Sequence, residues 1–453
     1  MKFTLDEIHQ ATGADISGEE CFEISTDTRT IKKGDLYLPL KGANFDGEDF
    51  CDKAIDAGAA GCFYTKESGK SNNFPLSTFH FQLNNLWLKV SDTLTAYLQL
   101  ANFARKKINP IVIGVTGSSG KTTTKEMIYS VVSQKYKAHK TYSNHNNEIG
   151  FCQTVLSMPE DCEVLIIEMG MRWPGEIELI AKYAEPDYAV ITNAGSAHIG
   201  RLGSLDNIAK AKCEITTNLK NTLIAHDNER IKKFANFDGE KLFYSLKDVK
   251  VIEMRSGYTK FQYKDNIYEL NVEGEYNVEN SISAIEAGLH LGMTYEEIKK
   301  GLLAYHPIEK RWEIQKVGGY NIINDSYNAN PESMKAAVST FLELYQNPVV
   351  ILGNMGELGE NEEYFHREMG KFLGERFGKT NAQFIIVGDL ALYIGEELLK
   401  YRYDVKHFDD NLATSRYILD NLHEGCTIFL KASRAMKFEE IIENLKILGE
   451  SKK

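Results

Sequence analysis

Short apolar runs alternate with amphipathic segments from about residue 110 to the end of the chain. The runs are rich in Ile and Val, as in strands that are buried on both faces of a sheet. One intervening segment, 125–134, places Met127, Ile128, Val131 and Val132 on one face of a helix. This alternation predicts parallel α/β sheets with right-handed crossover connections. The expected strands are 111–115, 164–168, 188–193, 349–354, 384–389 and 427–433.

The length of 453 residues exceeds what a single hydrophobic core supports, so we expect two or three domains. The N-terminal part has short strand and turn patterns, and a polar break follows near 70–77. Farther along, Pro307 and a charged stretch interrupt the helical pattern. We predict a small α/β domain at 1–84, a central parallel-sheet domain at 85–308 and a third α/β domain at 309–453.

Charge and composition exclude several classes of protein. Lys and Arg number 52 against 64 Asp and Glu, and the net charge of −12 argues against nonspecific binding of nucleic acid or anionic membranes. No apolar run approaches the roughly 20 residues of a membrane span, and no secretory signal precedes the first helix candidate. Seven scattered cysteines without C-x-x-C pairs indicate reduced thiols rather than disulfides or zinc ligands. We therefore expect a cytoplasmic protein.

The segment 114–126, GVTGSSGKTTTKE, is typical of a phosphate-binding loop, but it is shorter than the common form. The common pattern requires a glycine five places before Gly120, where Val115 stands. The context is nevertheless correct, because an apolar strand precedes the loop and an amphipathic helix follows it. We expect Lys121 to reach the β- and γ-phosphates and the Thr122 hydroxyl to bind Mg²⁺. The alternative is a glycine-rich turn with a surface lysine.

Two further residues follow strands that we expect in the same sheet. Glu168 ends the run 164–168, and His198 lies in a Gly- and Ser-containing loop after the run 188–193. Ligands gather at the carboxyl ends of parallel strands, so Glu168 is a candidate metal ligand and His198 a candidate site residue. The alternatives are a glutamate that ends a strand by chance and a structural histidine.

With these residues in place, the chain resembles the Mur ligases, the ATP-dependent amide-forming enzymes of peptidoglycan precursor synthesis. Their short T-G-x-x-G-K-T loop stands here at 116–122. The most specific segments are SNHNNEIG at 143–150 and INDSYNANPESM at 323–334. Further similar stretches are 25–42, 166–170, 197–204, 209–215, 274–288 and 430–440.

The resemblance implies a fold and a reaction. The fold is a UDP-binding first domain, an ATP-binding central domain and a Rossmann-like C-terminal domain that closes over the site. The substrates implied are UDP-N-acetylmuramoyl-tripeptide and D-alanyl-D-alanine, with ATP and two Mg²⁺ ions, in an enzyme expected to be a monomer. The tripeptide carboxylate attacks the γ-phosphate, and the dipeptide amine then attacks the acyl phosphate. The third residue of the peptide stem, lysine or meso-diaminopimelate, stays open.

The resemblance also implies roles for individual residues. The catalytic set is Lys121, Glu168, His198 and Lys212, and the metal ligands are Thr122, Glu168, His198 and Lys212 if carbamylated. The ATP-binding set is Thr116, Gly117, Ser118, Ser119, Gly120, Lys121, Thr122, Thr123, Asn277, Asn280, Arg311 and Asp325. The set for the UDP-linked substrate is Ser25, Thr26, Asp27, Arg29, Lys41, Asp46, Asn144, Asn146 and Asn147. The candidates for D-alanyl-D-alanine are Tyr327, Asn328, Asn330 and Arg434.

Several of these roles have plainer alternatives. The amides of Asn277 and Asn280, three residues apart, suit an adenine edge, but Asn277 is equally suited to cap a helix. We expect Arg311 to approach phosphate and Asp325 the ribose hydroxyls. Lys212 is either a carbamylated metal ligand or an ordinary exposed helix lysine. The asparagines of 144–147 either contact the muramoyl-peptide or form a polar turn.

The chain departs from the family pattern at a few positions. Glu48 stands where relatives often have histidine, Gly200 and Arg201 where an acidic and an aromatic residue are common, and Cys213 where glycine is usual.

Two other functions compete with the leading one. One is another Mur ligase or a folylpolyglutamate synthetase, and the other is a GTPase-like switch, which would need an N-K-x-D segment that the sequence lacks.

Overall fold

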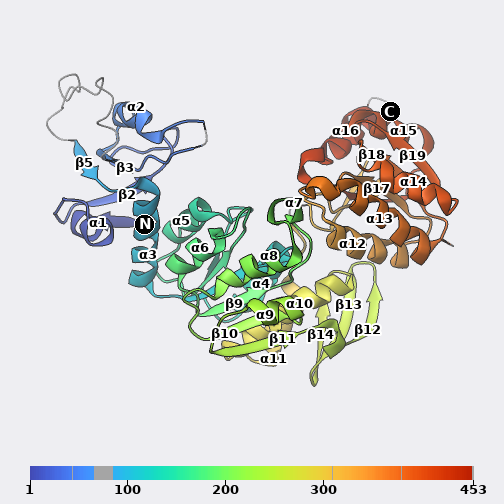
Figure 1. Cartoon of the computed structure of the whole chain (residues 1–453), viewed down its shortest axis with the longest axis horizontal. Coiled ribbons are helices and arrows are strands. Elements are labelled where there is room, and N and C mark those ends of the chain that lie inside the picture. The colour runs from blue at the N-terminus through green and yellow to red at the C-terminus, as the bar shows by residue number, and fades with distance from the viewer. Residues whose placement is uncertain (43, 66–84, 309, 379, 451–453) are drawn as a thin grey trace.

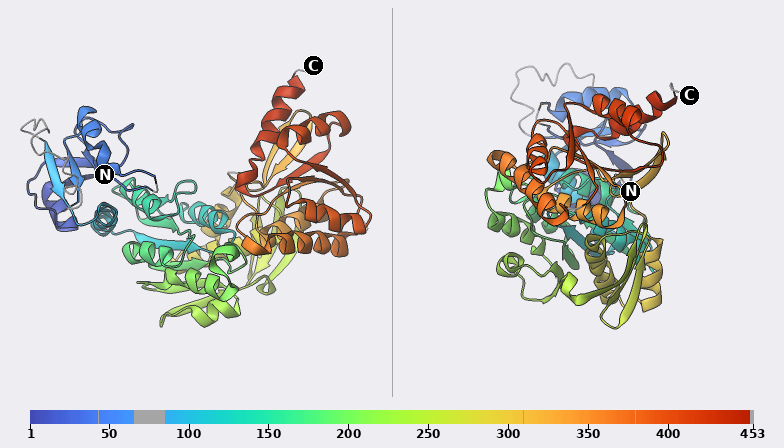
Figure 2. Two further views of the ribbon diagram at one scale, coloured as in Figure 1. Left: turned by 45° about the horizontal axis from the view of Figure 1, so that its top comes forward. Right: turned by 90° about the vertical axis from the view of Figure 1, so that its right-hand side faces the viewer.

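The computed structural model describes residues 1–42, 44–65, 85–308, 310–378 and 380–450. Three domains follow one another along the long axis of the molecule, with the N-terminal domain at one end and the C-terminal domain at the other (Figure 1). Figure 2 shows the central domain between them in a second orientation. The predicted break at 70–77 and the predicted boundaries at 84 and 309 fall on residues outside the described ranges, so these boundaries stay predictions.

The N-terminal domain is a five-stranded sheet in the order β1-β2-β3-β4-β5. Strand β1 pairs antiparallel with β2, and the other neighbours are parallel. Helix α1 begins with a capping box formed by Thr4 and Glu7 and ends at Gly13 in the left-handed conformation. Its elements are β1 (Lys2–Thr4), α1 (Leu5–Thr12), β2 (Cys21–Ser25), β3 (Leu36–Tyr37), α2 (Cys51–Asp56), β4 (Gly61–Tyr64) and β5 (Leu86–Lys89).

The central domain contains a six-stranded parallel sheet in the order β11-β10-β9-β6-β8-β7. The predicted strands 111–115, 164–168 and 188–193 are confirmed as β6, β8 and β9, and the predicted helix 125–134 falls within and just beyond α4. Its strands are β6 (Ile111–Thr116), β7 (Ala138–Lys140), β8 (Val164–Glu168), β9 (Tyr188–Ile191), β10 (Thr222–His226) and β11 (Glu240–Tyr244). Its helices are α3 (Thr93–Ile108), α4 (Lys121–Val132), α5 (Glu148–Leu156), α6 (Glu176–Ala184), α7 (Ile199–Leu202), α8 (Leu205–Cys213) and α9 (Glu229–Phe234).

A small antiparallel sheet, β12-β13-β14, and two helices complete the central domain. Helix α10 lies against α4, so the helix that follows the phosphate loop is covered by a second helix. The apolar faces of both helices contribute to one hydrophobic core with the central sheet. The elements are β12 (Val249–Arg255), β13 (Tyr258–Tyr263), β14 (Asn266–Leu270), α10 (Glu275–His290) and α11 (Tyr295–Ala304).

The C-terminal domain is a six-stranded sheet in the order β15-β16-β20-β17-β18-β19, in which only the β15–β16 pair is antiparallel. The predicted strands 349–354, 384–389 and 427–433 are confirmed as β17, β18 and β20. The strands are β15 (Glu313–Val317), β16 (Tyr320–Asn324), β17 (Val349–Gly353), β18 (Gln383–Val387), β19 (Asp404–Phe408) and β20 (Thr427–Lys431). The helices are α12 (Pro331–Leu344), α13 (Glu362–Phe377), α14 (Leu392–Lys400), α15 (Asn411–Asn421) and α16 (Glu439–Glu450).

Buried side chains join the central and C-terminal domains. Trp312, just before β15, lies with its ring 6.1 Å from that of Tyr276 on α10 and 5.3 Å from that of Phe429 on β20. Only 2% of Trp312 is exposed. This packing holds the C-terminal domain against α10 of the central domain. Among the described residues, no helix is long and apolar enough to cross a membrane.

Candidate active site

The loop between β6 and α4 is tightly enclosed. Gly120 has φ of +77°, and a Cβ added there would lie 2.5 Å from Oδ1 of Asn280. A Cβ added at Gly117 would lie 1.9 Å from Oγ1 of Thr192, the residue after β9. Gly117 is therefore required by close approach, and both glycines have a positive φ, +152° at Gly117, that other residues rarely adopt.

Asn193 holds the loop in shape from the neighbouring strand end. Its Oδ1 accepts hydrogen bonds from the backbone N–H groups of Ser118 at 3.1 Å and Ser119 at 3.0 Å. Its Nδ2 donates to Oγ of Ser119 at 2.9 Å. The Ser118 hydroxyl in turn donates to the carbonyl of Gly195 at 2.9 Å. The Asn193 amide, together with its own carbonyl and the Thr192 hydroxyl, therefore fixes the loop.

Lys121 begins α4 and lines the cavity above the loop. Its Nζ donates to the carbonyl oxygen of Gly117 at 2.8 Å, so the side chain folds back over the loop. Burial lowers the pKa of Lys121, and the nearby Glu168 carboxylate opposes that effect. The helix N-terminus adds positive potential at the same point. The arrangement suits an anion such as a phosphate.

Glu168, at the end of β8, is a buried carboxylate that accepts hydrogen bonds from two predicted site residues. Its Oε2 accepts from the Thr122 hydroxyl at 2.8 Å, and its Oε1 accepts from Nδ2 of Asn146 at 2.9 Å. The Nζ of Lys125, which is fully buried, lies 3.6 Å from Oε2. Lys125 also donates to the carbonyl of Thr141 at 2.8 Å. The Glu168 carboxylate therefore joins the phosphate-loop helix to the asparagine segment.

His198 and Lys212 lie at the same end of the central sheet. Nδ1 of His198 is 2.6 Å from Oε2 of Glu357, a residue of the C-terminal domain. Lys212, on α8, is fully buried, and its Nζ has no hydrogen-bond partner among the described residues. Burial, together with the charge of Lys121, holds the pKa of Lys212 well below its usual value. The alternative of an ordinary exposed lysine is therefore wrong.

The two asparagines of α10 face the loop. Helix α10 is capped by Gly274, so Asn277 lies inside its first turn and the alternative of an N-cap role is wrong. The Asn277 amide donates to the carbonyl of Glu273 at 2.6 Å. Asn280 lies against Gly120, and both asparagines line the cavity.

The C-terminal domain brings a second group of side chains to the cavity. Arg311 donates to Oγ1 of Thr122 at 3.0 Å, and its guanidinium lies 3.6 Å from the ring centre of Tyr327. Asp325, at the end of β16, accepts from Nζ of Lys431 at 2.5 Å. The backbone N–H of Trp312 donates to the same carboxylate at 3.2 Å. These contacts place Arg311 on the phosphate-loop side and hold Asp325 by a buried cation.

One cavity of about 930 Å³ between the central and C-terminal domains gathers most of the predicted residues. Thr116, Gly117 and Lys212 are not among the residues that line it. The predicted residues that line it are Ser118, Ser119, Gly120, Lys121, Thr122, Thr123, Asn144, Asn146, Asn147, Glu168, His198, Asn277, Asn280, Arg311, Asp325, Tyr327, Asn328 and Asn330.

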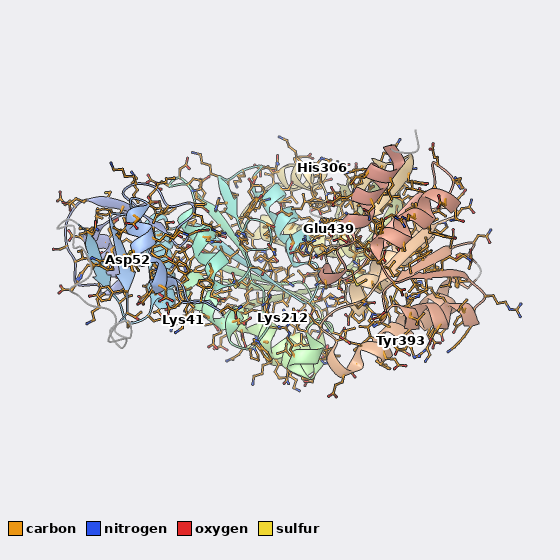
Figure 3. All side chains as sticks on the ribbon, turned by 90° about the horizontal axis from the view of Figure 1, so that it is seen from above. Lys41, Asp52, Lys212, His306, Tyr393 and Glu439 are labelled. Atoms are coloured by element: carbon orange, nitrogen blue, oxygen red, sulfur yellow. The ribbon has the colours of Figure 1, made fainter. Side chains whose placement is uncertain are left out.

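The remaining predicted residues lie elsewhere. Figure 3 shows Lys41 in the N-terminal domain, well away along the long axis from Glu439 in the C-terminal domain. Arg434 forms an ion pair of 2.7 Å with Glu439 and does not line the cavity. Those of the N-terminal domain, none of which lines the cavity, are Ser25, Thr26, Asp27, Arg29, Lys41 and Asp46.

The N-terminal candidates form local pairs. Nη2 of Arg29 lies 2.6 Å from Oδ2 of Asp27. The hydrogen bonds that Arg29 donates lower the pKa of Asp27 to about 2. Lys41 lies 3.7 Å from Asp46, and the Asp46 side chain caps the following turn by accepting from the N–H of Glu48 at 3.0 Å. Both cations are largely exposed. Exposed ion pairs of this kind contribute little to stability.

Sequence reasoning missed several residues at the cavity. His226, at the end of β10, pairs with Glu279 at 3.2 Å beside the asparagines of α10. The hydrogen bond with Glu279 raises the pKa of His226. Asn193 and Lys431 were present in the segments that carry the resemblance or adjoin them, but no pattern singled them out. Glu357 had no signal, because its partner is nearly 160 residues away and only domain docking brings them together.

The donor set around Thr122 fits Mg²⁺ that is bound together with a nucleotide. Mg²⁺ usually takes one or two carboxylates and completes its shell with phosphate oxygens and water. Here one buried hydroxyl and the buried carboxylate of Glu168 lie 2.8 Å apart at the edge of the cavity. Within the described ranges, no group of three His, Cys, Asp or Glu side chains forms a ready-made metal cluster.

Comparison with known proteins places the chain among relatives along almost its whole length. Residues 22–102 match the catalytic domain model of the Mur ligase family, 115–288 the Mur ligase middle domain, and 310–434 the Mur ligase glutamate ligase domain. The chain is 38% identical to the UDP-N-acetylmuramoyl-tripeptide–D-alanyl-D-alanine ligase of Bacillus subtilis strain 168, over 93% of this chain and 92% of that protein. The chain belongs to the Mur ligase family.

Solved structures of Mur ligases agree with this assignment. The structure of MurF from Acinetobacter baumannii is similar with a TM-score of 0.87 at 28% identity, covering 99% of both chains. MurF ligase from Thermotoga maritima, solved in complex with ADP, is similar with a TM-score of 0.81 at 25% identity. That comparison covers 95% of this Mur ligase and 99% of the other chain. The predicted three-domain α/β fold and the family resemblance are both confirmed, and the GTPase-like alternative is wrong.

Proposed function

We propose that this Mur ligase joins D-alanyl-D-alanine to UDP-N-acetylmuramoyl-tripeptide in an ATP-dependent reaction that proceeds through an acyl phosphate. The observation that carries the proposal is the 3.0 Å contact from Arg311 to Thr122. Through it the C-terminal domain docks onto the phosphate loop, and the cavity becomes continuous between the two domains. The near full-length similarity to ligases that bear this name supports the choice of substrates.

ATP would lie with its phosphates over the loop 117–122. Backbone N–H groups at the start of α4 and the Nζ of Lys121 face this position, and Arg311 approaches from the other domain. The adenine would lie near Asn277 and Asn280, whose amides both donate and accept. Asp325 would accept from the ribose hydroxyls, held in place by Lys431. ADP in the similar Thermotoga maritima structure supports a nucleotide in this role.

In the first step, a tripeptide carboxylate oxygen attacks the γ-phosphorus of ATP. The bond from that phosphorus to the bridging oxygen breaks, and ADP leaves. Two anions must approach one another, so cations around them lower the barrier. Lys121 from the central domain and Arg311 from the C-terminal domain supply positive charge at the phosphate loop. Mg²⁺, held by Thr122 and Glu168, would neutralise further phosphate charge when bound.

In the second step, the amine nitrogen of D-alanyl-D-alanine attacks the acyl carbon. The carbon–oxygen bond to phosphate breaks, phosphate leaves, and the nitrogen gives up a proton. Water competes with the amine for the acyl phosphate, so a closed cavity between the domains protects it. Tyr327, Asn328 and Asn330 line the wall on the side of the C-terminal domain and are our candidates for the dipeptide. Arg434 would first have to leave Glu439.

We propose that Lys212 is carbamylated and helps His198 to hold a second Mg²⁺. Burial and the charge of Lys121 lower the pKa of Lys212, which favours the neutral amine, the form that reacts with CO₂. The product is a carbamate anion with oxygen ligands, and one proton is released. The partnerless Nζ of Lys212 and the nearby positive charge of Lys121 both favour an anion at this position.

The UDP-linked substrate would extend from the cavity toward the N-terminal domain. Asn144, Asn146 and Asn147 border the cavity on the side of the central domain, and the hydroxyl and basic residues of the N-terminal domain would bind the nucleotide end.

We propose domain boundaries at 84/85 and 308/309. The monomeric state and the cytoplasmic location stay predictions, which light scattering and cell fractionation test.

A phosphate-release assay tests the proposed function. The purified chain is mixed with ATP, Mg²⁺, UDP-N-acetylmuramoyl-tripeptide and D-alanyl-D-alanine, with lysine and meso-diaminopimelate stems tested separately. With at least one of the two stems, we expect phosphate release that requires both substrates. Mass spectrometry should then show a product equal to the UDP-linked tripeptide plus D-alanyl-D-alanine, less one water. Release that is independent of D-alanyl-D-alanine, or no release with either stem, contradicts the proposal.

A further inference from the structure

The loop that carries His198 is held by a turn of the C-terminal domain. We call this contact the clasp and define it as His198, Gly200 and Arg201 on one side, with Glu357 and Gly359 on the other. Oε2 of Glu357 lies 2.6 Å from Nδ1 of His198, and Oε1 lies 3.6 Å from Nη2 of Arg201. One carboxylate from the closing domain therefore meets both side chains of the central domain.

Backbone contacts fix the clasp at close range. The N–H of Gly200 donates to the carbonyl oxygen of Glu357 at 3.1 Å. A Cβ added at Gly200 would lie 2.4 Å from the backbone nitrogen of Gly359, so a side chain at this position would force the two segments apart. The absence of a side chain at Gly200 permits this approach, and the guanidinium of Arg201 supplies the second ion pair.

Both residues at the centre of the clasp have a costly backbone conformation. His198 has φ of +66° and Glu357 has φ of +63°, and neither is glycine. Non-glycine residues in the left-handed region persist only where their surroundings hold them, and they gather at functional sites. Two such residues in direct contact across a domain interface indicate that this side-chain pair is positioned for a purpose beyond packing.

We propose that Glu357 is a positioning residue for His198. With its Oε2 only 2.6 Å from Nδ1, the carboxylate favours the histidine tautomer that carries its proton on Nδ1, which leaves the lone pair of Nε2 for a metal ion in the cavity. Histidine ligands of metals commonly donate their other N–H to a carboxylate in this way. The inference rests on the proposed function, in which His198 is a metal ligand. Because Glu357 belongs to the C-terminal domain, the ligand is oriented only when that domain has docked.

A second contact allows orientation to be separated from docking. Glu332, at the start of α12, accepts from the backbone N–H of Ser196 at 2.9 Å and from its hydroxyl at 2.8 Å. This pair and the contact from Arg311 to Thr122 keep the two domains together without the Glu357 side chain. A substitution of Glu357 should therefore disturb the histidine more than the docking.

Binding of Mn²⁺, used as a paramagnetic probe in place of Mg²⁺, tests the inference. The full chain is incubated with a nonhydrolysable ATP analogue and UDP-N-acetylmuramoyl-tripeptide, and bound Mn²⁺ is counted by electron paramagnetic resonance. The variants are Glu357→Ala, Glu357→Gln and the control Glu360→Ala, which removes an exposed carboxylate three residues away. Circular dichroism checks each fold, and the isosteric Glu357→Gln carries the comparison if Glu357→Ala does not fold.

We expect two Mn²⁺ ions in the wild-type protein. Glu357→Ala should weaken the second ion by about 10- to 100-fold, in line with the loss of a carboxylate behind a metal-bound histidine. Glu357→Gln should lose less, because its amide carbonyl keeps an acceptor oxygen beside Nδ1, and Glu360→Ala should match the wild type. The first ion and the affinity for the ATP analogue should not change in any variant.

Two results would overturn the inference: a single Mn²⁺ in the wild type, or a second ion whose affinity changes less than twofold in both Glu357 variants. The proposed function fails separately. If the wild-type chain binds two ions but releases no phosphate with both substrates, the ligase assignment is wrong while the positioning role stands.

Discussion

The substitution Gly120→Ala separates the cost of backbone strain from the cost of misplacing a binding residue. Gly120 caps α4 with φ of +77°, and alanine in that conformation costs roughly 1–2 kcal/mol of stability. The added Cβ would also lie 2.5 Å from Oδ1 of Asn280, the far end of a side chain that rotates away easily. Relief of this clash therefore costs little stability. It does move the Asn280 amide away from the position in which we expect it to contact adenine.

Gly175 supplies a matched control. It caps α6 with φ of +88°, and a Cβ added there has nothing within 4 Å. Gly175→Ala should lose roughly the same 1–2 kcal/mol of stability and retain nucleotide affinity. Gly120→Ala should lose in addition about one hydrogen bond to the nucleotide, roughly 1–1.5 kcal/mol, or about tenfold in the Kd for ADP.

The assay is chemical denaturation for stability and isothermal titration with ADP for affinity, on both variants and the wild type. We expect similar losses of unfolding free energy in the two variants and a weaker Kd only for Gly120→Ala. Equal ADP affinity in Gly120→Ala and Gly175→Ala would refute the placement of the nucleotide against Asn280.

Three further predictions follow from the same geometry. Lys121→Ala should abolish turnover, because the cation over the loop is lost, while circular dichroism stays unchanged; near-normal turnover would mean that the phosphate site is misplaced. Asn193→Ala removes the side-chain oxygen that accepts from two loop N–H groups and should raise the KM for ATP about tenfold, which steady-state kinetics measures. Lys212→Met should raise the thermal midpoint in bicarbonate-free buffer and abolish turnover, because it removes a buried amine without a partner. The folded pKa of Lys212 is depressed, so wild-type stability should rise with pH between that pKa and about 10.5, and Lys212→Met should lose this slope in denaturation series across pH.

The sequence was most informative where strands are buried on both faces. β6, β8, β9, β17, β18 and β20 have continuous apolar runs and were all predicted. The small sheet β12-β13-β14 was missed, because most of β12 is exposed and its sequence, VKVIEMR, mixes charges with apolar residues. Strands β15 and β19 lie at the edges of their sheet. They were missed because they too are partly exposed and mix charged with apolar residues.

Among the residues of the candidate site, those placed by local sequence patterns were predicted, and those placed by contacts between distant segments were not. The phosphate loop, Glu168 and His198 were found because strand ends and a helix start place them by local rules. Asn193, Glu357 and Lys431 were not, since their roles depend on contacts between strands or between domains that no short pattern encodes. Lys212 was found only through family resemblance, and its complete burial is visible only in the folded chain.

Transfer of isotope from the substrate carboxylate to phosphate tests the acyl phosphate most directly. The tripeptide substrate is prepared with both oxygens of the reacting carboxylate as ¹⁸O, and the reaction is run with unlabelled ATP and D-alanyl-D-alanine. An acyl phosphate route predicts one ¹⁸O atom in each phosphate released and one in the amide carbonyl of the product, as measured by mass spectrometry. Phosphate without ¹⁸O, together with formation of the amide, would contradict the mechanism proposed for this Mur ligase.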